Sequence, residues 1–129
     1  MYCLDTNVII DFFRGDKVLA KKVGEMGPDE IFFTEITLCE LFRGAYKSMQ
    51  KEKSLQLIYD LVRNYRFLAL TPDSCEIFGR DFNALARMGK PTQEFDLIVS
   101  SIAKENDLIL VTRNRKHVEN IPDLKLEEW

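Results

Sequence analysis

The most constraining feature of the sequence is a run of four aliphatic residues, Leu108 to Val111, with polar residues on either side. A strand with one wet face alternates apolar with polar residues, so a run without alternation predicts a strand that is covered on both faces. Such strands lie in the middle of parallel sheets, and helices cover both faces of those sheets. The run therefore predicts an α/β fold.

The rest of the chain alternates between strand and helix patterns. Besides 108–111, short strands are expected at 2–5, 30–34, 67–70 and 124–126. The helical spacing of apolar residues, with turn signals between segments, predicts helices at 6–14, 17–26, 35–50, 54–66, 72–88, 94–105 and 116–120. Thr71-Pro72 is a strong helix start, because an N-cap hydroxyl precedes Pro at the first helical position. This order predicts a three-layer α/β/α sandwich with a mainly parallel central sheet.

The length and the distribution of charge limit the class of protein. A chain of 129 residues fits one compact unit, so we expect residues 1–129 to form a single domain. The longest apolar runs fall far short of the ~20 residues that cross a bilayer. Charged residues are scattered through residues 5–17, and a secretion signal keeps its apolar stretch free of charge. We therefore expect a cytoplasmic protein with no membrane partner.

The overall charge is slightly negative, with 18 Lys and Arg against 21 Asp and Glu and a formal net charge of −3. This balance argues against binding nucleic acid by bulk positive charge. It leaves a nuclease open, because metal ions can supply positive charge where the chemistry happens. The three cysteines are far apart and form no CxxC pair, so we expect reduced thiols packed as small apolar residues.

Several familiar active-site motifs are missing from the sequence. There is no GxxxxGK[ST] loop and no GxGxxG loop, which removes P-loop ATPases and Rossmann dehydrogenases from consideration. There is no GxSxG motif either. The lone histidine, His117, follows a basic stretch, and we expect it at the surface or in contact with phosphate.

Three acidic residues stand in apolar surroundings, namely Asp5, Glu40 and Asp96. A charge in such surroundings is costly unless it is paired or bound to a cation. In a parallel sheet, the ends of the first and fourth strands and the start of the helix at 94–105 can meet at one edge. The carboxylates would then form a nest of like charges, which raises their pKa values unless divalent cations neutralise them. Oxygen ligands favour Mg²⁺ or Mn²⁺ over zinc.

Each of these acids also has an ordinary structural interpretation. Asp5 could cap the helix that follows it. Glu40 could pair with Arg43, which lies one helical turn further on. Asp96 could be a first-turn acid that faces the dipole of its own helix. The coincidence of all three in one chain favours a shared site over three separate explanations.

Four segments together resemble the PIN-domain ribonucleases and span nearly the whole chain. They are 4–10 (LDTNVII), 37–44 (TLCELFRG), 95–103 (FDLIVSSIA) and 108–114 (LILVTRN). The size of the chain and the lack of extra domains look most like the VapC toxin branch of type II toxin–antitoxin systems. The resemblance implies a PIN-like fold and metal-dependent endoribonuclease activity, in which Mg²⁺ or Mn²⁺ activates water for attack on the scissile phosphorus.

The resemblance also implies roles for individual residues. Asp5 and Asp96 would bind metal directly, and Glu40 would do so directly or through water. The supporting polar groups near the phosphate would be Thr6, Thr112 and Asn114. The residues that could position the RNA backbone, or could simply form a solvated charged face, are Arg43, Lys47, Arg113, Arg115 and Lys116.

One departure from the family pattern concerns the number of metal ions. Many relatives carry a fourth acid at about the position of His117, and Glu94 could compensate for its loss here. If neither position serves, a mechanism with one metal ion is favoured.

The resemblance implies two kinds of protein partner. The relatives are usually homodimers, and an antitoxin silences them by inserting its C-terminal segment into the acidic groove. The apolar helical hairpin at 36–65 is the surface we expect to serve the dimer or the antitoxin.

Three other functions compete with a toxin. The chain could be an RNA-processing nuclease without an antitoxin, or a non-catalytic module that binds RNA or acts as a scaffold. A receiver-like signalling domain is a weaker rival. It needs paired acids after the first strand and a phosphoacceptor Asp after the third. Here Asp5 is followed by Thr-Asn, and 67–70 is followed by Thr71-Pro72.

Overall fold

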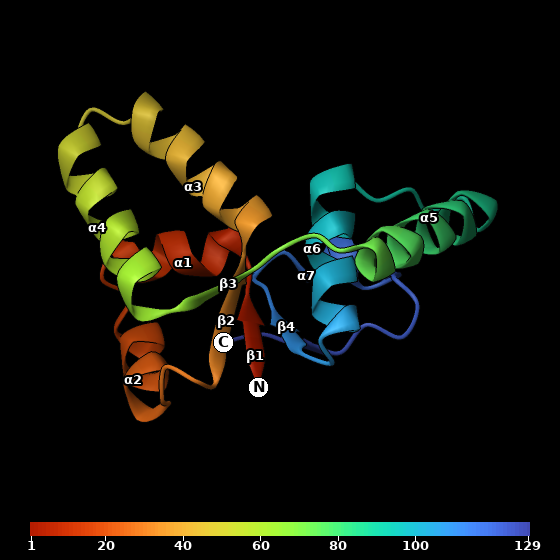
Figure 1. Cartoon of the computed structure of the whole chain (residues 1–129), viewed down its shortest axis with the longest axis horizontal. Helices are drawn as coiled ribbons and strands as arrows, with labels where there is room; N and C mark the ends of the chain where they lie inside the picture. The colour runs from red at the N-terminus through yellow and green to blue at the C-terminus, as the bar shows by residue number, and fades with distance from the viewer.

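A computed structural model describes all residues, 1–129, and contains one five-stranded sheet and seven helices (Figure 1). The strands are β1 Tyr2–Leu4, β2 Ile31–Thr34, β3 Arg66–Leu68, β4 Ile109–Val111 and β5 Leu126–Glu127. The helices are α1 Thr6–Phe13, α2 Lys17–Glu25, α3 Glu35–Lys47, α4 Lys51–Asn64, α5 Pro72–Arg87, α6 Glu94–Glu105 and α7 Arg115–Val118. The strand order is β3-β2-β1-β4-β5, and all four pairings are parallel.

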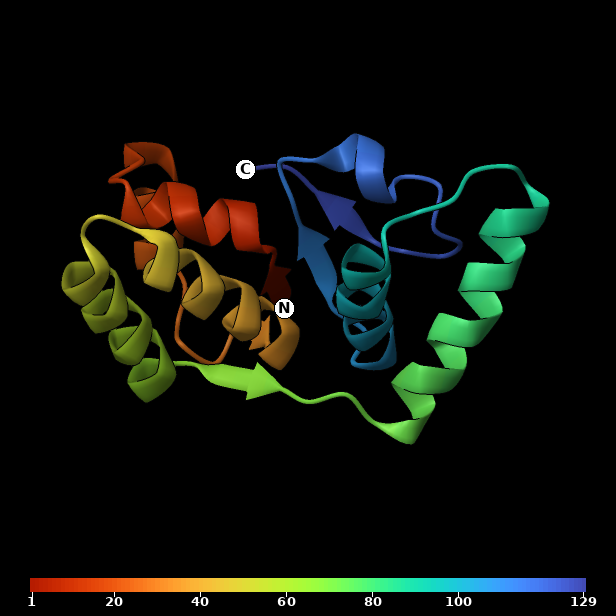
Figure 2. The same cartoon turned by 90° about the horizontal axis from the view of Figure 1, so that it is seen from above.

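The predicted fold class is confirmed, because helices cover both faces of a parallel sheet. Helices α1 to α4 lie on one side of the sheet, and α5 and α6 lie on the other (Figure 1). Seen from above, α6 lies between β4 and α5, and α5 forms the outer wall of the molecule (Figure 2). Its start is as predicted, with Thr71 as N-cap and Ser74 completing a capping box.

The predicted boundaries were wrong by a few residues in the helical hairpin. Helix α3 ends at Lys47, because Ser48 has an extended backbone and its hydroxyl accepts a hydrogen bond from the Gln50 N–H at 3.0 Å. Helix α4 begins at Lys51, three residues before the predicted start. Its first turn is polar and carries no apolar spacing that a sequence pattern could detect.

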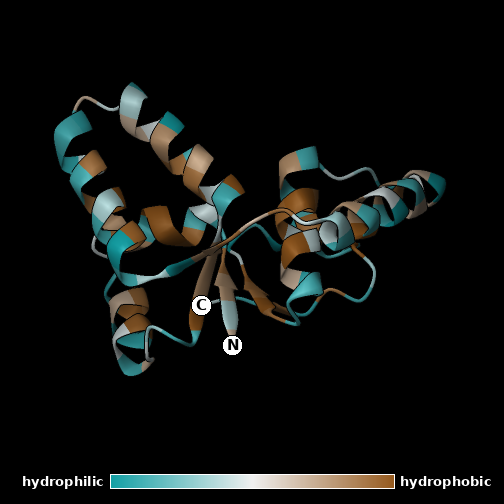
Figure 3. Ribbon diagram, viewed as in Figure 1, coloured by the Kyte–Doolittle hydropathy of each residue, from teal (hydrophilic) through white to brown (hydrophobic).

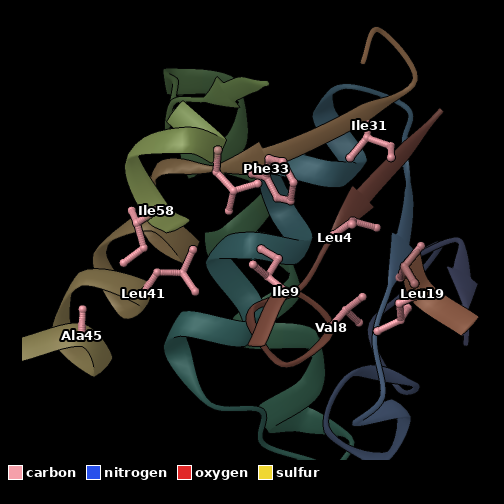
Figure 4. Packing of buried hydrophobic residues seen from close by; sticks show 11 residues of the cluster. Leu4, Val8, Ile9, Leu19, Ile31, Phe33, Leu41, Ala45 and Ile58 are labelled. Atoms are coloured by element: carbon pink, nitrogen blue, oxygen red, sulfur yellow. The ribbon is translucent and has the colours of Figure 1, made fainter. Parts of the chain in front are cut away.

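The hydrophobic core forms two clusters, one on each face of the sheet. Successive residues of a strand point to opposite faces, so Leu4 belongs to one cluster and Cys3 to the other. The larger cluster joins the sheet to α1–α4 and includes Leu4, Val8, Ile9, Leu19, Ile31, Phe33, Leu41, Ala45 and Ile58 (Figure 4). The second cluster joins Cys3 and β4 to α5, α6 and α7. Hydropathy colouring shows the apolar ribbon concentrated around the sheet (Figure 3).

The three cysteines differ from the prediction. Cys3 is buried, and burial raises the pKa of its thiol to about 12, so it packs as a neutral apolar group. Cys39 and Cys75 are exposed free thiols, so the prediction that all three are packed inside was wrong for these two. Both lie on helices whose other faces supply the core contacts.

The pairing of β1 with β4 prepares the position of the site. Leu4 is in register with Val111, and the Asp5 N–H continues the ladder by donating to the Val111 carbonyl at 2.9 Å. The residues that follow the two strands, Asp5 and Thr112, are therefore neighbours although they lie far apart in the sequence. No helix in the chain has the length and apolar character needed to span a bilayer.

Truncating the centre of β4 tests the importance of the sheet core. Leu110 is 1% exposed in the second cluster, so Leu110→Ala removes apolar contacts and leaves a cavity. We expect the free energy of unfolding to fall by about 2–5 kcal/mol in urea titrations followed by circular dichroism. The control Val62→Ala, at an exposed position of α4, is expected to change it by less than about 0.5 kcal/mol. Equal effects of the two changes would contradict the assigned core.

Candidate active site

Asp5 stands at the junction of β1 and α1 and is buried, with 7% of its surface exposed. It is the N-cap of α1, and its Oδ1 accepts a hydrogen bond from the Thr6 N–H at 2.8 Å. The capping interpretation is therefore correct, and it leaves the second carboxylate oxygen free for another contact. That Oδ2 accepts a hydrogen bond from the Thr112 hydroxyl at 3.0 Å.

Thr112 connects this carboxylate to the loop after β4. Its buried hydroxyl donates to Asp5 and accepts a hydrogen bond from the Asn114 N–H at 3.1 Å. Both hydrogen-bonding directions of the hydroxyl are used, so its orientation is fixed. Thr112 thus holds the Asp5 carboxylate in place, while the Asn114 side chain is exposed.

Glu40 comes from α3 and reaches the same junction. Its Oε1 accepts a hydrogen bond from the Thr6 hydroxyl at 2.8 Å. Its Oε2 lies 4.0 Å from the Arg43 guanidinium, which is mostly exposed. The helical pair with Arg43 therefore exists as a loose contact, and the closer partner of Glu40 is Thr6, the residue directly after Asp5.

Asp96 lies in the first turn of α6 and faces the other two acids. Its Oδ2 is buried and makes no hydrogen bond, and the His117 ring comes to 3.7 Å from this oxygen, beyond hydrogen-bonding distance. A buried carboxylate oxygen without a partner is uncommon in proteins. In this chain such an atom occurs where three acidic residues come together.

The pKa directions show that the acids interact. Burial raises the pKa of the Asp96 carboxyl, the charges of Asp5 and Glu40 raise it further, and His117 opposes them. Burial also raises the pKa of the Asp5 carboxyl, against the hydrogen bonds from Thr6 and Thr112 and the charge of His117. The structure therefore brings Asp5, Glu40 and Asp96 into mutual electrostatic range.

The side chains do not close into a complete cage. No three His, Cys, Asp or Glu side chains lie close enough together to form a recognisable metal-binding group. Glu94 is exposed in the first turn of α6 and is not among the charges that act on Asp96. The geometry thus presents three interacting carboxylates around one unpartnered oxygen, and it leaves Glu94 outside them.

The donor set suits a hard divalent cation. All the groups that converge are carboxylates and hydroxyls, which are ligands for Mg²⁺ or Mn²⁺ and not the thiolates or imidazole clusters of structural zinc sites. Asp5 and Asp96 could hold an ion directly. The unpartnered Asp96 oxygen, the second lone pairs of the Asp5 oxygens and the nearby Glu40 fit that role.

The basic residues predicted to touch RNA have different surroundings. Arg113 is already engaged, since its Nη1 lies 2.9 Å from carboxylate oxygens of both Asp11 and Asp16. Its Nε also donates to the Trp129 carbonyl at 3.1 Å. The remaining four are exposed on α3 and α7, namely Arg43, Lys47, Arg115 and Lys116.

Two contacts around the site were not foreseen from the sequence. His117 was expected at the surface, yet its ring reaches Asp96. The carboxylates that bind Arg113 were not singled out at all. The turn at Gly15-Asp16 was visible as a turn signal, and Asp16 does cap α2, but nothing in the local sequence pairs it with a residue 97 positions away.

Comparison with known proteins gives one consistent result. The PIN domain profile matches residues 2–122 of this chain. Ribonuclease VapC1 of Haemophilus influenzae is 31% identical across 100% of this chain and 98% of its own length. The tRNA(fMet)-specific endonuclease VapC of Shigella flexneri is 28% identical across 99% of this chain and 97% of its own length.

A solved structure agrees in both sequence and shape. VapBC-1 from nontypeable Haemophilus influenzae contains a chain that is 31% identical, with a TM-score of 0.88, over 99% of this chain and 97% of that one. Four conserved features of the sequence pattern, a matching profile and a matching fold thus point the same way. The chain belongs to the PIN domain family and, within it, to the VapC ribonucleases.

Proposed function

We propose that this protein is an endoribonuclease that cuts RNA with Mg²⁺ or Mn²⁺ held by Asp5 and Asp96, with Glu40 beside them. The observation that carries the proposal is the buried Asp96 oxygen, which has no hydrogen-bond partner and faces two further carboxylates. A divalent cation at this point would satisfy that oxygen and would remove the like-charge repulsion. The ribonuclease names of full-length relatives support the same substrate class.

The chain's own residues prepare the site for a cation. Thr6 and Thr112 bind Asp5 from two sides, and Thr6 also orients Glu40, so the carboxylates are positioned before anything binds. Such supporting hydrogen bonds tune both the orientation of metal ligands and their affinity. When bound, the ion supplies the positive charge that activates water and stabilises the charge that develops on the scissile phosphate.

We further propose that the protein is the toxin of a VapBC-type pair and is blocked by an antitoxin segment. A hollow of about 460 Å³ between α1, α3 and α4 supports this role. It is lined in part by Ile10, Phe13 and Leu57, and Glu40 lies on its edge. An apolar segment seated there would end beside the acids. This part of α3–α4 belongs to the hairpin predicted to serve a partner.

We also propose that the protein forms a homodimer. Large apolar side chains are exposed on the same hairpin, where Tyr46 is 66% and Met49 is 104% exposed, and Tyr59 and Val62 are exposed further along α4. Exposed apolar groups of this kind, gathered on one hairpin, are typical of surfaces that bind another chain.

The first test is metal-dependent cleavage of RNA. With Mg²⁺ or Mn²⁺ we expect endonucleolytic cuts with a 5′ phosphate and a 3′ hydroxyl, and we expect EDTA to abolish them. Asp5→Asn or Asp96→Asn should lower the rate by at least about a hundredfold, because removing even supporting partners of metal ligands costs 10- to 100-fold. Asp60→Asn, at an acid paired with Arg63 on α4, is the matched control and should retain activity. Cleavage that persists in EDTA would overturn the proposal.

The role of Thr112 can be separated from that of the acids. Thr112→Val removes the hydroxyl that binds Asp5 while keeping the side-chain shape, so Mn²⁺ affinity should fall by about 10- to 100-fold. Calorimetric titration with Mn²⁺ measures this change. Thr112→Ser keeps the hydroxyl and should bind nearly as well as the wild type. Equal affinities for the Val and Ser variants would show that the hydroxyl has no such role.

The raised pKa of Asp5 predicts a gain in stability when its charge is removed. Because burial raises the pKa of the folded carboxyl above its ordinary 3.8, the ionised form destabilises the native state at neutral pH. Asn caps helices as well as Asp does, so Asp5→Asn should raise the Tm at pH 7 in EDTA. A gain of 1 kcal/mol corresponds to about 4 °C for a domain of this size.

The pH dependence gives the sign of this effect independently. The penalty is fully present above the raised pKa and disappears as pH falls towards 3.8, where both states are protonated. The Tm difference between Asp5→Asn and the wild type should therefore shrink on acidification. A variant that is less stable than the wild type at pH 7, or a difference that grows in acid, would contradict the assigned environment.

A further inference from the structure

A second concave region lies next to the acidic site and is entirely different in character. It is a hollow of about 300 Å³ between the loop that joins α5 to α6 and the short helix α7. No hydrophobic residue lines it. The polar residues on its walls are Lys90, Thr92, Gln93, Lys116, His117 and Asn120.

The charge of this hollow is positive and uncompensated. Lys90 and Lys116 line it, and no carboxylate does. Neither lysine takes part in an ion pair, and the nearest polar contact of Lys90 is the Asn120 side-chain oxygen at 3.5 Å. Most other well-placed cations in the chain, such as Lys104 and Arg113, are bound to carboxylates. In a chain with a net charge of −3, the hollow is a local excess of positive charge.

The backbone that carries Lys90 is fixed. Helix α5 ends in a Schellman motif, in which Gly89 adopts a positive φ of 68° and donates to Ala86, while the Lys90 N–H donates to the Leu85 carbonyl at 2.9 Å. The opposite wall is anchored by Val118 of α7, which is 2% exposed in the second core cluster. The two lysines therefore start from rigid positions, and only their side chains have to adjust to a ligand.

The hollow and the acidic site share a boundary residue. His117 lines the hollow, and the same ring lies 3.7 Å from the Asp96 carboxylate. Gln93, also on the wall, is the residue before α6 and stands three positions before Asp96. A strand of RNA that passes the acids therefore reaches the hollow at the next step along its backbone.

We propose that this hollow binds a phosphate group of the RNA strand that neighbours the one being cut. Lysine ammonium groups bind phosphate as point charges, and Gln93, Thr92 and Asn120 add neutral polar partners. Three carboxylates next door repel a polyanion, so a strand needs positive charge close by to approach them. Lys90 and Lys116 supply that charge at the edge of the site. The inference rests on the proposed RNA substrate.

Because His117 is the only histidine in the chain, it gives a direct spectroscopic test. The proton between its ring nitrogens has a single NMR resonance, which can be followed while inorganic phosphate is added in EDTA at constant pH and ionic strength. We expect a saturable shift in the wild-type protein. Lys90→Gln combined with Lys116→Gln should weaken binding by about tenfold or more, because two charge-assisted contacts are lost. The control Lys21→Gln, on α2, should bind like the wild type.

RNA kinetics decide whether the bound phosphate belongs to the substrate. With Mn²⁺ and an RNA that the wild type cuts, the double lysine variant should raise KM by about tenfold and change kcat by less than about twofold, since the lysines bind ground state and transition state alike. RNA binding by Asp5→Asn protein should lose salt dependence when the lysines are also changed, by about 0.7 in the logarithmic slope for each phosphate contact on a single strand. Both lysines are exposed, so the Tm of the variant should match the wild type.

The outcomes separate this inference from the proposed function. A His117 resonance that does not move, or that moves equally in the double variant, overturns the phosphate site. An unchanged KM in the double variant overturns the assignment to RNA even if free phosphate binds. A wild-type protein that cuts no RNA overturns the proposed function instead, and the phosphate titration then decides alone whether the hollow binds anions.

Discussion

The hydrogen bond between Thr112 and Asp5 is the contact on which the site depends. It joins residues 107 positions apart, and it forms because β1 and β4 are parallel neighbours whose carboxyl ends coincide. Asp5 is already committed on its other side as the cap of α1, so the carboxylate is gripped from both the sheet and the helix. A one-residue slip of β4 against β1 would point Thr112 to the opposite face and release the acid.

The site concentrates like charges, and the fold bears the cost. Burial and the neighbouring carboxylates raise the pKa of Asp96, and burial raises that of Asp5. The hydrogen bonds from Thr6 and Thr112 oppose this trend without cancelling it. Sites of this type trade stability for a prearranged set of ligands. The two apolar clusters on either face of the sheet supply the stability that the acids remove.

The sequence allowed the fold class and the convergence of the three acids to be predicted, for the same physical reason. Parallel strands place their carboxyl ends at one edge, so residues that follow those strands meet there whatever their spacing in the chain. What could not be predicted depends on side-chain geometry or on polar segments without periodicity. The start of α4 lies in a polar turn, and His117 turns towards Asp96 by a choice of rotamer that no local pattern encodes.

Residue-level roles were harder to predict than residue positions. Arg113 was expected to meet RNA as part of a basic stretch, yet two aspartates from the α1–α2 region bind it. Its place in the sequence gave its charge and left its partner open, since the partners are about a hundred residues away. The arginine instead ties the turn after α1 to the loop that contains Thr112. This clamp has a consequence in acid. Hydrogen bonds from Leu19 and Arg113 lower the pKa of Asp16, whereas burial raises the pKa of Asp5. On acidification the reactive carboxylates thus discharge first while the strut that braces them still holds its charge, so the enzyme switches off before its framework loosens and recovers when the medium is neutralised.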